Sequence, residues 1–400
     1  MRVTLIGPAY PLRGGIAHHV YYLQQELAKR GHTVQVVSFR KLYPFRELYP
    51  ANFFPGSTEF DSSGSKLDAG AISVLSFLNP ISWARAFSIV KAFSPDVIVF
   101  QWWQPFFAPV LGTLARLFRW KGLKCVMECH NVFPHERSPF DRLLLKFASA
   151  PIDAFITHST SERNDLLTVA PSKKISVSAL PFPTEFSSGT KHARDGRTIL
   201  FFGTVRKYKG LDVLLAAMPK VLSQIECRLV IAGEFYDSID KYRQLIRDYG
   251  IEQHVYIDDR YIPNEEIAGI FDGVDLLVLP YLSASQSAVA SISLANALPV
   301  IASRSGGLSE IVIENFNGLL FPVGDSEALA DQITTYFGNN LGPVFANNML
   351  SVVKAKRDGL GKLIEDIVQD LDAKSPTRRS RLREDNRAAK ASDPPFFDNR

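Results

Sequence analysis

The feature that most constrains the fold is a regular alternation of short apolar runs and amphipathic segments between residues 198 and 321. The apolar runs have the length of buried strands and cover residues 198–202, 228–232, 254–258, 275–280, 299–302 and 318–321. Apolar residues recur at helical spacing in the segments between them, at 210–222, 238–249, 264–272 and about 287–297. Strands that alternate with helices form a parallel sheet with helices on both faces, so we expect a doubly wound α/β domain here.

The first half of the chain shows the same alternation less regularly. Its apolar runs lie at 3–6, 34–38, 96–100, 123–129, 152–157 and 177–183. Residues 41–80 are rich in Pro, Gly, Ser and aromatic residues and lack a clear period, so we expect a long surface excursion there. The sequence therefore predicts two Rossmann-like α/β domains that face each other across a cleft.

Changes in composition set the expected boundaries. Residues 187–197 are polar and poor in apolar side chains, as is typical of a linker. We expect an N-terminal domain at 1–186 and a C-terminal domain at 198–345. An amphipathic pattern at 350–371 predicts a last helix within 346–373, and 374–400 lack a periodic apolar face and are expected to be disordered.

Composition excludes several classes of protein. The net charge is +4, and residues 374–400 alone contribute +4, so the remainder sums to about zero and no nucleic-acid partner is indicated. The three cysteines lack paired metal-ligand spacing, which favours core positions for Cys125 and Cys129 and a reducing compartment. No stretch of 18 uncharged apolar residues is present, which favours a soluble or at most membrane-associated protein.

A basic loop separates the strand at 198–202 from its helix. Gly203 ends the strand, and Arg206, Lys207 and Lys209 precede the helix N-terminus. Positive side chains are unfavourable beside the positive end of a helix dipole unless an anion is bound there. Backbone amides, a helix dipole and long cations can together hold a diphosphate. The alternative interpretation is a solvated basic loop.

Two further loops of the second domain precede predicted helices. One contains Ser285, Gln286 and Ser287, and the other contains a Gly-Gly pair followed by Glu310 in a first helical turn. The serines fit either phosphate contact or helix capping, and Glu310 fits either ligand contact or compensation of the helix dipole. Because three helix N-termini point toward one rim of the sheet, a phosphate site is favoured.

The first domain has polar and glycine residues at the equivalent strand ends. Gly14 and Gly15 open its first helix, where they allow either a ligand or another strand to approach the backbone. The loop does not spell G-x-G-x-x-G, so a dinucleotide site is not indicated. His130 and Asn131 follow the strand at 123–129 and are candidates for ligand contact or simple capping.

Other features of this domain leave their roles open. Trp102, Trp103, Phe106 and Phe107 flank a turn after the strand at 96–100, where they could stack on a sugar or lipid or pack in the core. Thr160 or Ser161 is the candidate N-cap of the helix that follows the strand at 152–157.

Several motifs together resemble the family 4 retaining glycosyltransferases of the GT-B fold. They are P-x-x-G-G-I near the start, HNVFPHE in the middle, FFGTVRKYKGLDVLL, and PVIASRSGGLSEIVIENFNGLLFPVGDSEALADQI. The resemblance covers about residues 1–335. It implies transfer of a sugar from a nucleotide diphosphate sugar, with the donor on the C-terminal domain, the acceptor on the N-terminal domain, and neither a metal nor another cofactor. It also implies that the last helix packs back on the N-terminal domain.

The resemblance assigns roles to the candidate residues. Arg206 and Lys209 correspond to the pair that holds the donor diphosphate and stabilises the leaving group. Gly14 and Gly15 correspond to the glycine loop that faces the phosphates and the acceptor, and His130 to the histidine near the reacting sugar.

One motif of the family is replaced in this chain. The E-x7-E positions beside the donor read Ala284 and Ile292, and the loop SASQSAV is similar to a Ser/Thr-Gln-Ser version in which Gln286 and backbone amides contact the donor. Ala288 also stands where glycine is more usual in this loop, and Ala297-Leu298 stands where a small residue followed by glycine is more usual. The identity of the donor therefore stays open.

The mechanism predicted from these residues lacks a carboxylate nucleophile. Without an acid pair across the cleft, we expect same-face attack, in which the leaving diphosphate helps to deprotonate the acceptor hydroxyl. The alternatives are an inactive GT-B scaffold, a sugar-nucleotide epimerase or phosphorylase on this fold, and a two-lobed solute-binding protein. The resemblance favours a cytoplasmic enzyme of cell-surface polysaccharide or glycolipid assembly, with a possible peripheral contact at the inner face of the membrane, for example through arginines of 374–400.

Overall fold

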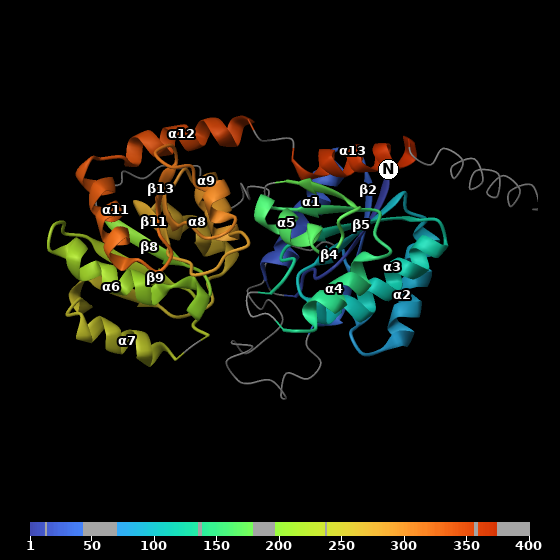
Figure 1. The fold of residues 1–400 in the computed structure, drawn as a ribbon, viewed down its shortest axis with the longest axis horizontal. Helices are drawn as coiled ribbons and strands as arrows, with labels where there is room; N and C mark the ends of the chain where they lie inside the picture. The colour runs from blue at the N-terminus through green and yellow to red at the C-terminus, as the bar shows by residue number, and fades with distance from the viewer. Residues whose placement is uncertain are drawn as a thin grey trace, which may run out of the picture.

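The computed structural model describes residues 1–12, 14–42, 70–134, 138–178, 197–236, 238–355 and 359–373. They form two α/β domains that lie side by side (Figure 1). The predicted fold class is confirmed, because both sheets are parallel and helices cover both faces of each. The expected linker at 187–197 lies outside the described residues apart from Arg197, and the tail at 374–400 lies wholly outside them.

The N-terminal domain contains a seven-stranded sheet of order β3-β2-β1-β4-β5-β6-β7. Its strands are β1 Arg2–Ile6, β2 Thr33–Lys41, β3 Ile72–Ser76, β4 Val97–Trp102, β5 Lys124–Cys129, β6 Ala154–Thr157 and β7 Lys174–Val177. The order reverses between β1 and β4, as in other doubly wound sheets. Two expectations were wrong: β3 lies within the predicted surface excursion, and β7 ends where the strand at 177–183 was expected to begin.

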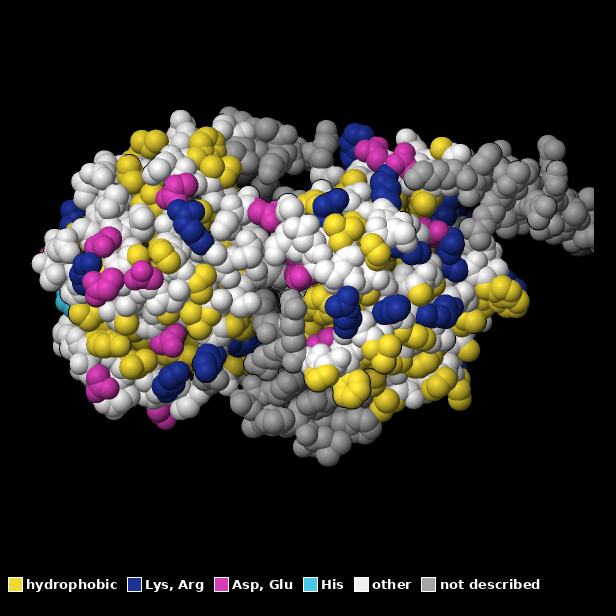
Figure 2. Space-filling view, in the orientation of Figure 1, with side chains coloured by type: hydrophobic (Ala, Val, Ile, Leu, Met, Phe, Trp, Pro, Cys, Tyr) yellow, Lys and Arg dark blue, Asp and Glu magenta, His cyan; other side chains and the backbone are white. Residues whose placement is uncertain are grey.

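Helices cover the two faces of this sheet, and their bounds are α1 Gly15–Lys29, α2 Pro80–Phe93, η2 Pro105–Phe107, α3 Ala108–Trp120, α4 Asp141–Ser149 and α5 Thr160–Leu167. Helices α2, α3 and α4 pack on one face, where Val90, Leu111 and Leu145 join the core. Helix α1 packs on the other face through Val20 and Leu23. The outer surface of α2, α3 and α4 carries hydrophobic side chains beside Lys and Arg (Figure 2).

The C-terminal domain contains a six-stranded sheet of order β10-β9-β8-β11-β12-β13. Its strands are β8 Thr198–Phe202, β9 Arg228–Ala232, β10 Val255–Asp258, β11 Leu276–Leu279, β12 Val300–Ser303 and β13 Gly318–Phe321. The chain between them forms η4 Lys207–Lys209, α6 Leu211–Leu222, α7 Ile239–Asp248, η5 Glu252–His254, α8 Asn264–Asp272, α9 Ala288–Ala295 and α10 Leu308–Ile311, and α11 Ser326–Gly338 follows. The predicted strands and helices of this half match these elements within two residues.

Two helices, rather than the single predicted one, follow α11. Helix α12, Gly342–Ala355, packs on α9 of the C-terminal domain, where Met349 contacts Leu294. Helix α13, Leu360–Ala373, packs on α1 of the N-terminal domain. There Glu365 accepts hydrogen bonds from Arg30 at 2.8 and 2.9 Å and lies 2.7 Å from His32 Nε2. Helices α12 and α13 therefore pack on different domains.

Two open questions of the N-terminal domain are answered by packing. Trp102, Trp103 and Phe107 are buried in the core, and Phe106 stacks on Phe77 with ring centroids 3.9 Å apart, so these rings pack internally. The N-cap of α5 is Ser159, whose hydroxyl accepts from the amide of Glu162 at 3.2 Å, and not Thr160 or Ser161. No helix among the described residues is long and apolar enough to span a bilayer.

Candidate functional site

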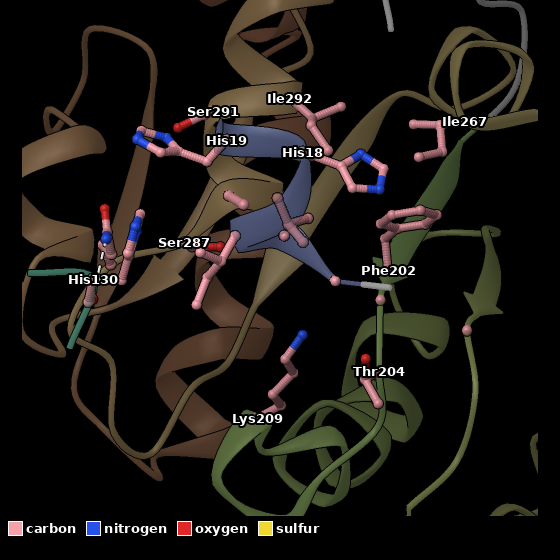
Figure 3. Close-up of a pocket in the computed structure, with 18 of the residues that line it drawn as sticks. His18, His19, His130, Phe202, Thr204, Lys209, Ile267, Ser287, Ser291 and Ile292 are labelled. Atoms are coloured by element: carbon pink, nitrogen blue, oxygen red, sulfur yellow. Dashed lines mark hydrogen bonds between the residues drawn. The ribbon is translucent and has the colours of Figure 1, made fainter. Parts of the chain in front are cut away.

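The carboxyl ends of strands from both sheets face one cavity between the domains, with a volume of about 520 Å³. The N-terminal domain supplies the loops that follow β1 and β5, and the C-terminal domain supplies those that follow β8, β9, β10 and β11. Parallel sheets bind ligands at such strand ends because loops and helix N-termini converge there. Figure 3 shows side chains from both domains pointing into this space.

The wall on the N-terminal side contains the residues that the sequence indicated. Gly14 and Gly15 line the cavity at the start of α1, and His130 and Asn131 line it after β5. Gly14 has a φ of 120°, and nothing lies within 4 Å of where its Cβ would be. A side chain there would be strained and would enter the cavity, so the glycine keeps the backbone accessible to a ligand.

Behind this wall lies a buried polar network that the sequence did not indicate. Glu128 on β5 and Gln101 on β4 are partners in the sheet register and are both fully buried. Gln101 Nε2 donates to Glu128 Oε2 at 2.8 Å, and His19 Nε2 lies 2.6 Å from Glu128 Oε1. His158 Nε2 lies 3.1 Å from the same oxygen. Burial raises the pKa of Glu128, but the two histidines outweigh it and hold that pKa well below its usual value.

This network fixes the protonation of His130. Glu128 is anionic and can only accept, so Gln101 must turn its amide nitrogen to Glu128 and its oxygen to His130 Nε2, which lies 2.6 Å away. His130 Nε2 therefore carries the proton. Burial, followed by the charge on His19, lowers the pKa of His130 well below its usual value. The neutral ring then keeps a free electron pair on Nδ1, as a hydrogen-bond acceptor.

His19, Glu128 and His130 also have ligand-type atoms within 4.8 Å of one another. Imidazole and carboxylate are suitable ligands for zinc and related ions. Both Glu128 oxygens and His130 Nε2 already have hydrogen-bond partners within the protein, however. A metal ion would have to displace these contacts, so the arrangement fits a hydrogen-bonded network better than a metal centre.

The wall on the C-terminal side contains a buried ammonium group. Lys209 is only 9% exposed, and its side chain points into the cavity (Figure 3). Burial, together with the charge of Arg206, lowers its pKa. Gly203, whose φ is 94°, makes room for it, because a Cβ there would lie 3.2 Å from Lys209 Nζ. In the described structure no carboxylate pairs with Lys209, so the positive charge is available to an anion.

Arg206, which is predicted to hold the donor diphosphate together with Lys209, lies against a tyrosine ring in the described structure. Its guanidinium lies over the Tyr236 ring, 3.9 Å from the centroid, and Arg206 is not among the described residues that line the cavity. The two cations of the loop are thus separated. Lys209 faces the cavity, and Arg206 contributes to the charge near it.

The loop after β11 lines the cavity and joins the domains. The Ser285 hydroxyl donates to Asn131 Oδ1, and Gln286 Nε2 donates to the His130 carbonyl at 3.2 Å. Ser287 is the N-cap of α9, because its hydroxyl accepts from the Ala290 amide at 3.2 Å. The capping interpretation is therefore correct for Ser287, and Ser285 and Gln286 contact the opposite domain.

Glu310 does not reach the cavity in the described structure. Its carboxylate accepts hydrogen bonds from the amide of Thr160, at 2.8 and 2.9 Å, and from that of Ser161 at 3.3 Å. These amides form the N-terminus of α5, where a carboxylate is stabilised by the helix dipole. Glu310 thus links the domains, and this placement differs from the predicted ligand contact. The backbone at Gly306, which precedes Glu310, leaves no space for a ligand. A Cβ at this position would lie 1.7 Å from the Ala284 carbonyl oxygen.

Two further polar groups line the cavity without having been predicted. Asn264 Nδ2 is buried and has no hydrogen-bond partner in the described structure. Burial raises the pKa of Tyr281 to about 12, so its hydroxyl stays protonated. In the sequence, the one sign that Asn264 and Tyr281 could contact a ligand is that each follows a predicted strand. The cavity therefore offers a buried cation and neutral hydrogen-bond donors on one side, and an imidazole acceptor on the other.

Two family models match consecutive parts of the chain. The model described as Glycosyltransferase Family 4 matches residues 13–185, and the one described as Glycosyl transferases group 1 matches 196–339. An uncharacterized glycosyltransferase of Methanocaldococcus jannaschii is 31% identical over 125 residues, which is 31% of this chain and 32% of that protein. The D-inositol 3-phosphate glycosyltransferase of Corynebacterium efficiens is 30% identical over 146 residues, which is 35% of this chain and 34% of that enzyme. The chain thus aligns with about a third of the length of these relatives.

The fold is shared with solved glycosyltransferase structures over nearly the whole chain. The structure of Anabaena HepE in complex with UDP superposes with a TM-score of 0.65 at 16% identity, covering 94% of this chain and 100% of that one. One model matches each domain, and the two domains have the GT-B arrangement. The chain therefore belongs to the family 4 glycosyltransferases of the GT-B fold.

Proposed function

We propose that this protein transfers a sugar from a nucleotide diphosphate sugar to an acceptor hydroxyl, with retention of the anomeric configuration. The observation that carries the proposal is the buried Lys209 ammonium, which faces the cavity and pairs with no carboxylate among the described residues. A buried charge without a partner is costly for the fold. A bound diphosphate supplies the missing partner, which gives the charge a function.

The donor lies, in this proposal, on the C-terminal side of the cavity. Lys209 contacts the diphosphate, and the N-terminal turn of α9, which also lines the cavity, offers backbone amides to it. Arg206 adds positive charge, and Asn264 Nδ2 is a free donor for an oxygen of the nucleotide. HepE has been solved with UDP and with UDP-glucose, which supports a nucleoside diphosphate as the ligand here without selecting the base.

The acceptor hydroxyl lies on the N-terminal side, near His130 and the Gly14-Gly15 loop. Glu234 is the one carboxylate among the described residues that line the cavity, so an acid and nucleophile pair is not assembled there. We therefore propose same-face attack: the acceptor oxygen bonds to the anomeric carbon while the sugar–phosphate bond breaks, and the leaving phosphate oxygen takes the hydroxyl proton. Lys209 stabilises the charge that develops, and such donors contribute about 3 kcal/mol each. No metal is needed in this scheme.

The test is a thermal-shift and calorimetric screen against UDP, GDP and ADP in the presence of EDTA. We expect one nucleoside diphosphate to stabilise the protein, and Lys209→Met to reduce the shift at the same nucleotide concentration. The corresponding nucleotide sugar then serves as donor in an acceptor screen, and proton NMR of the first product reports the anomeric configuration. Absence of binding by all three nucleotides would contradict the proposal and favour an inactive scaffold, whereas an inverted product would contradict only the same-face mechanism.

The structure offers no observation that favours a sugar-nucleotide epimerase. The same screen separates the two functions, because an epimerase converts the nucleotide sugar without an acceptor and without releasing nucleoside diphosphate. We further propose that the acceptor belongs to a cell-surface polysaccharide or glycolipid, since a Saccharomyces cerevisiae protein that is 24% identical over 330 residues is named as a phosphatidylinositol N-acetylglucosaminyltransferase subunit.

A further inference from the structure

The helices on the outer side of the N-terminal sheet have an uneven charge. Helices α2, α3 and α4 contain six basic residues and one acidic residue: Arg85, Lys91, Arg116, Arg119, Arg142 and Lys146 against Asp141. Asp141 is buried and accepts a hydrogen bond from the Ser138 amide at 2.7 Å. The whole chain has 45 basic and 41 acidic residues, so this layer differs strongly from the rest. Its outward charge is therefore almost entirely positive.

The same layer exposes large apolar side chains. Trp120 is 77% exposed, Ile81 75%, Phe140 68% and Leu143 66%. Phe147, one turn after Leu143 on α4, is 40% exposed. Single exposed apolar residues are ordinary, but Phe140, Leu143 and Phe147 follow one another at helical spacing and form a group of the kind that marks an interaction surface. Figure 2 shows this hydrophobic area beside a row of Lys and Arg over α2, α3 and α4.

The cations of this face lie against its aromatic rings. The Arg116 guanidinium lies 3.9 Å from the centroid of the Phe147 ring, and Lys121 Nζ lies 4.3 Å from that of Trp120. On α4 the exposed residues are Arg142, Leu143, Lys146 and Phe147, so each turn presents one cation and one apolar group. Such long cationic side chains can stay in a polar layer while the neighbouring aromatic groups enter an apolar one.

We propose that this surface, which we call the α2–α4 face, docks the protein on an anionic lipid bilayer. The boundary between headgroups and acyl chains is negatively charged on its polar side and apolar beneath, which matches exposed aromatic groups interleaved with cations. The alternating arrangement favours a bilayer over a protein groove, because every exposed charged side chain described on α2, α3 and α4 is basic.

Docking through this face presents the N-terminal domain, which contains the proposed acceptor side of the cavity, to a lipid-linked acceptor. The binding itself does not rest on the proposed function, since it depends only on surface charge and exposed apolar area. Nucleotide affinity therefore serves as an independent control of folding and of the cavity.

The experiment is co-sedimentation of the full chain with vesicles. One set contains phosphatidylcholine with 30% phosphatidylglycerol, and the other contains phosphatidylcholine alone. Three variants of the α2–α4 face are compared with wild type: Phe140→Ser with Leu143→Ser, Trp120→Ser, and Lys146→Glu. Tyr256→Ser, which removes a ring that is 64% exposed on the C-terminal domain, and Lys241→Glu, also on that domain, are the matched controls.

We expect binding to the anionic vesicles only, weakened by added salt. Each cation near such a surface contributes roughly a fivefold change in partitioning, so Lys146→Glu should weaken binding at least fivefold, and the apolar variants should weaken it similarly. The controls should bind as wild type does. No binding to anionic vesicles, or equal binding to uncharged ones, would overturn the proposal. Binding that the face variants leave unchanged would overturn the choice of this surface in favour of another one.

Discussion

Replacement of Lys209 by methionine should strengthen the fold and weaken the site at the same time. The ammonium is 9% exposed, has a lowered pKa, and has no carboxylate partner among the described residues. Each unit by which folding lowers a lysine pKa corresponds to about 1.4 kcal/mol of lost stability. Methionine keeps most of the apolar stem of Lys209 and removes the charge, so Lys209→Met should be at least as stable as wild type.

The effect on ligand binding has the opposite sign. A charge-assisted hydrogen bond contributes about 1.5–3 kcal/mol, so removal of the ammonium should weaken binding of a nucleoside diphosphate roughly 10- to 150-fold. Lys207→Met is the matched control, since Lys207 is exposed in the same η4 turn. Calorimetry measures the affinity, and the thermal midpoint without ligand measures the stability of each variant.

The stability difference should also depend on pH in a defined direction. The pKa of Lys209 is lower in the folded protein than in the unfolded chain, so the unfolded state binds more protons between that lowered pKa and about 10.4. The free energy of unfolding of the wild-type protein therefore rises with pH in this window. The amount by which wild type is less stable than Lys209→Met should shrink accordingly. A variant that is clearly less stable than wild type at pH 7, or that binds the nucleotide unchanged, would refute this account of the buried charge.

Three further substitutions test contacts around the cavity. Glu128→Gln should destabilise the N-terminal domain by about 3 kcal/mol in thermal or urea unfolding, because it removes the anion shared by two histidines. Gly306→Ala should lower both stability and nucleotide affinity, since its Cβ would lie 1.7 Å from the Ala284 oxygen, whereas Gly338→Ala meets nothing within 4 Å and should do neither. Arg30 and His32 lower the pKa of Glu365 to about 2, so stabilisation of α13 should be lost as pH falls from about 4.3 toward 2, and Glu365→Gln should speed hydrogen exchange in α13 already at pH 7.

The C-terminal domain could be predicted closely because its elements are regular and buried. The apolar runs at 198–202 and 228–232 are the observed β8 and β9, since both strands are covered on two faces and have no alternation to obscure them. Strand β3 was missed because it lies at the sheet edge, pairs only with β2, and carries a mixed exposed and buried pattern. Helix α12 ends at Ala355 and α13 begins at Leu360, and the similar apolar periodicity of these two segments suggested a single helix.

The part of the candidate site that could be predicted consists of residues that directly follow predicted strands. Strand ends of parallel sheets converge, so Gly14, His130, Lys209 and Gln286 could be grouped from sequence and do line one cavity. Side-chain direction is not encoded in this way. The orientation of Arg206 toward Tyr236 depends on the loop after β9, which neighbours its own loop only in the folded sheet.

Contacts between the two domains could not be predicted for a related reason. The carboxylate of Glu310 is ordinary for the first turn of a helix, and nothing local indicates that its partners are amides 149 and 150 residues earlier in the chain. The buried set around Glu128 was missed likewise, because its histidines come from α1 and from the end of β6, and their distance from β5 is decided by helix packing on the sheet.

The electrostatics of the cavity follow from which domain supplies each buried charge. On the C-terminal side the Lys209 cation is buried and faces the cavity, and none of the described carboxylates pairs with it. On the N-terminal side Glu128 is anionic, but His19, His158 and Gln101 occupy its oxygens, so His130 meets the cavity as a neutral acceptor. An anionic group is therefore favoured beside Lys209, and a neutral hydroxyl group is compatible with the neutral ring of His130. In the proposed function, this asymmetry places the donor beside Lys209 and the acceptor beside His130, without the two glutamates of the E-x7-E motif, whose positions are Ala284 and Ile292 in this chain.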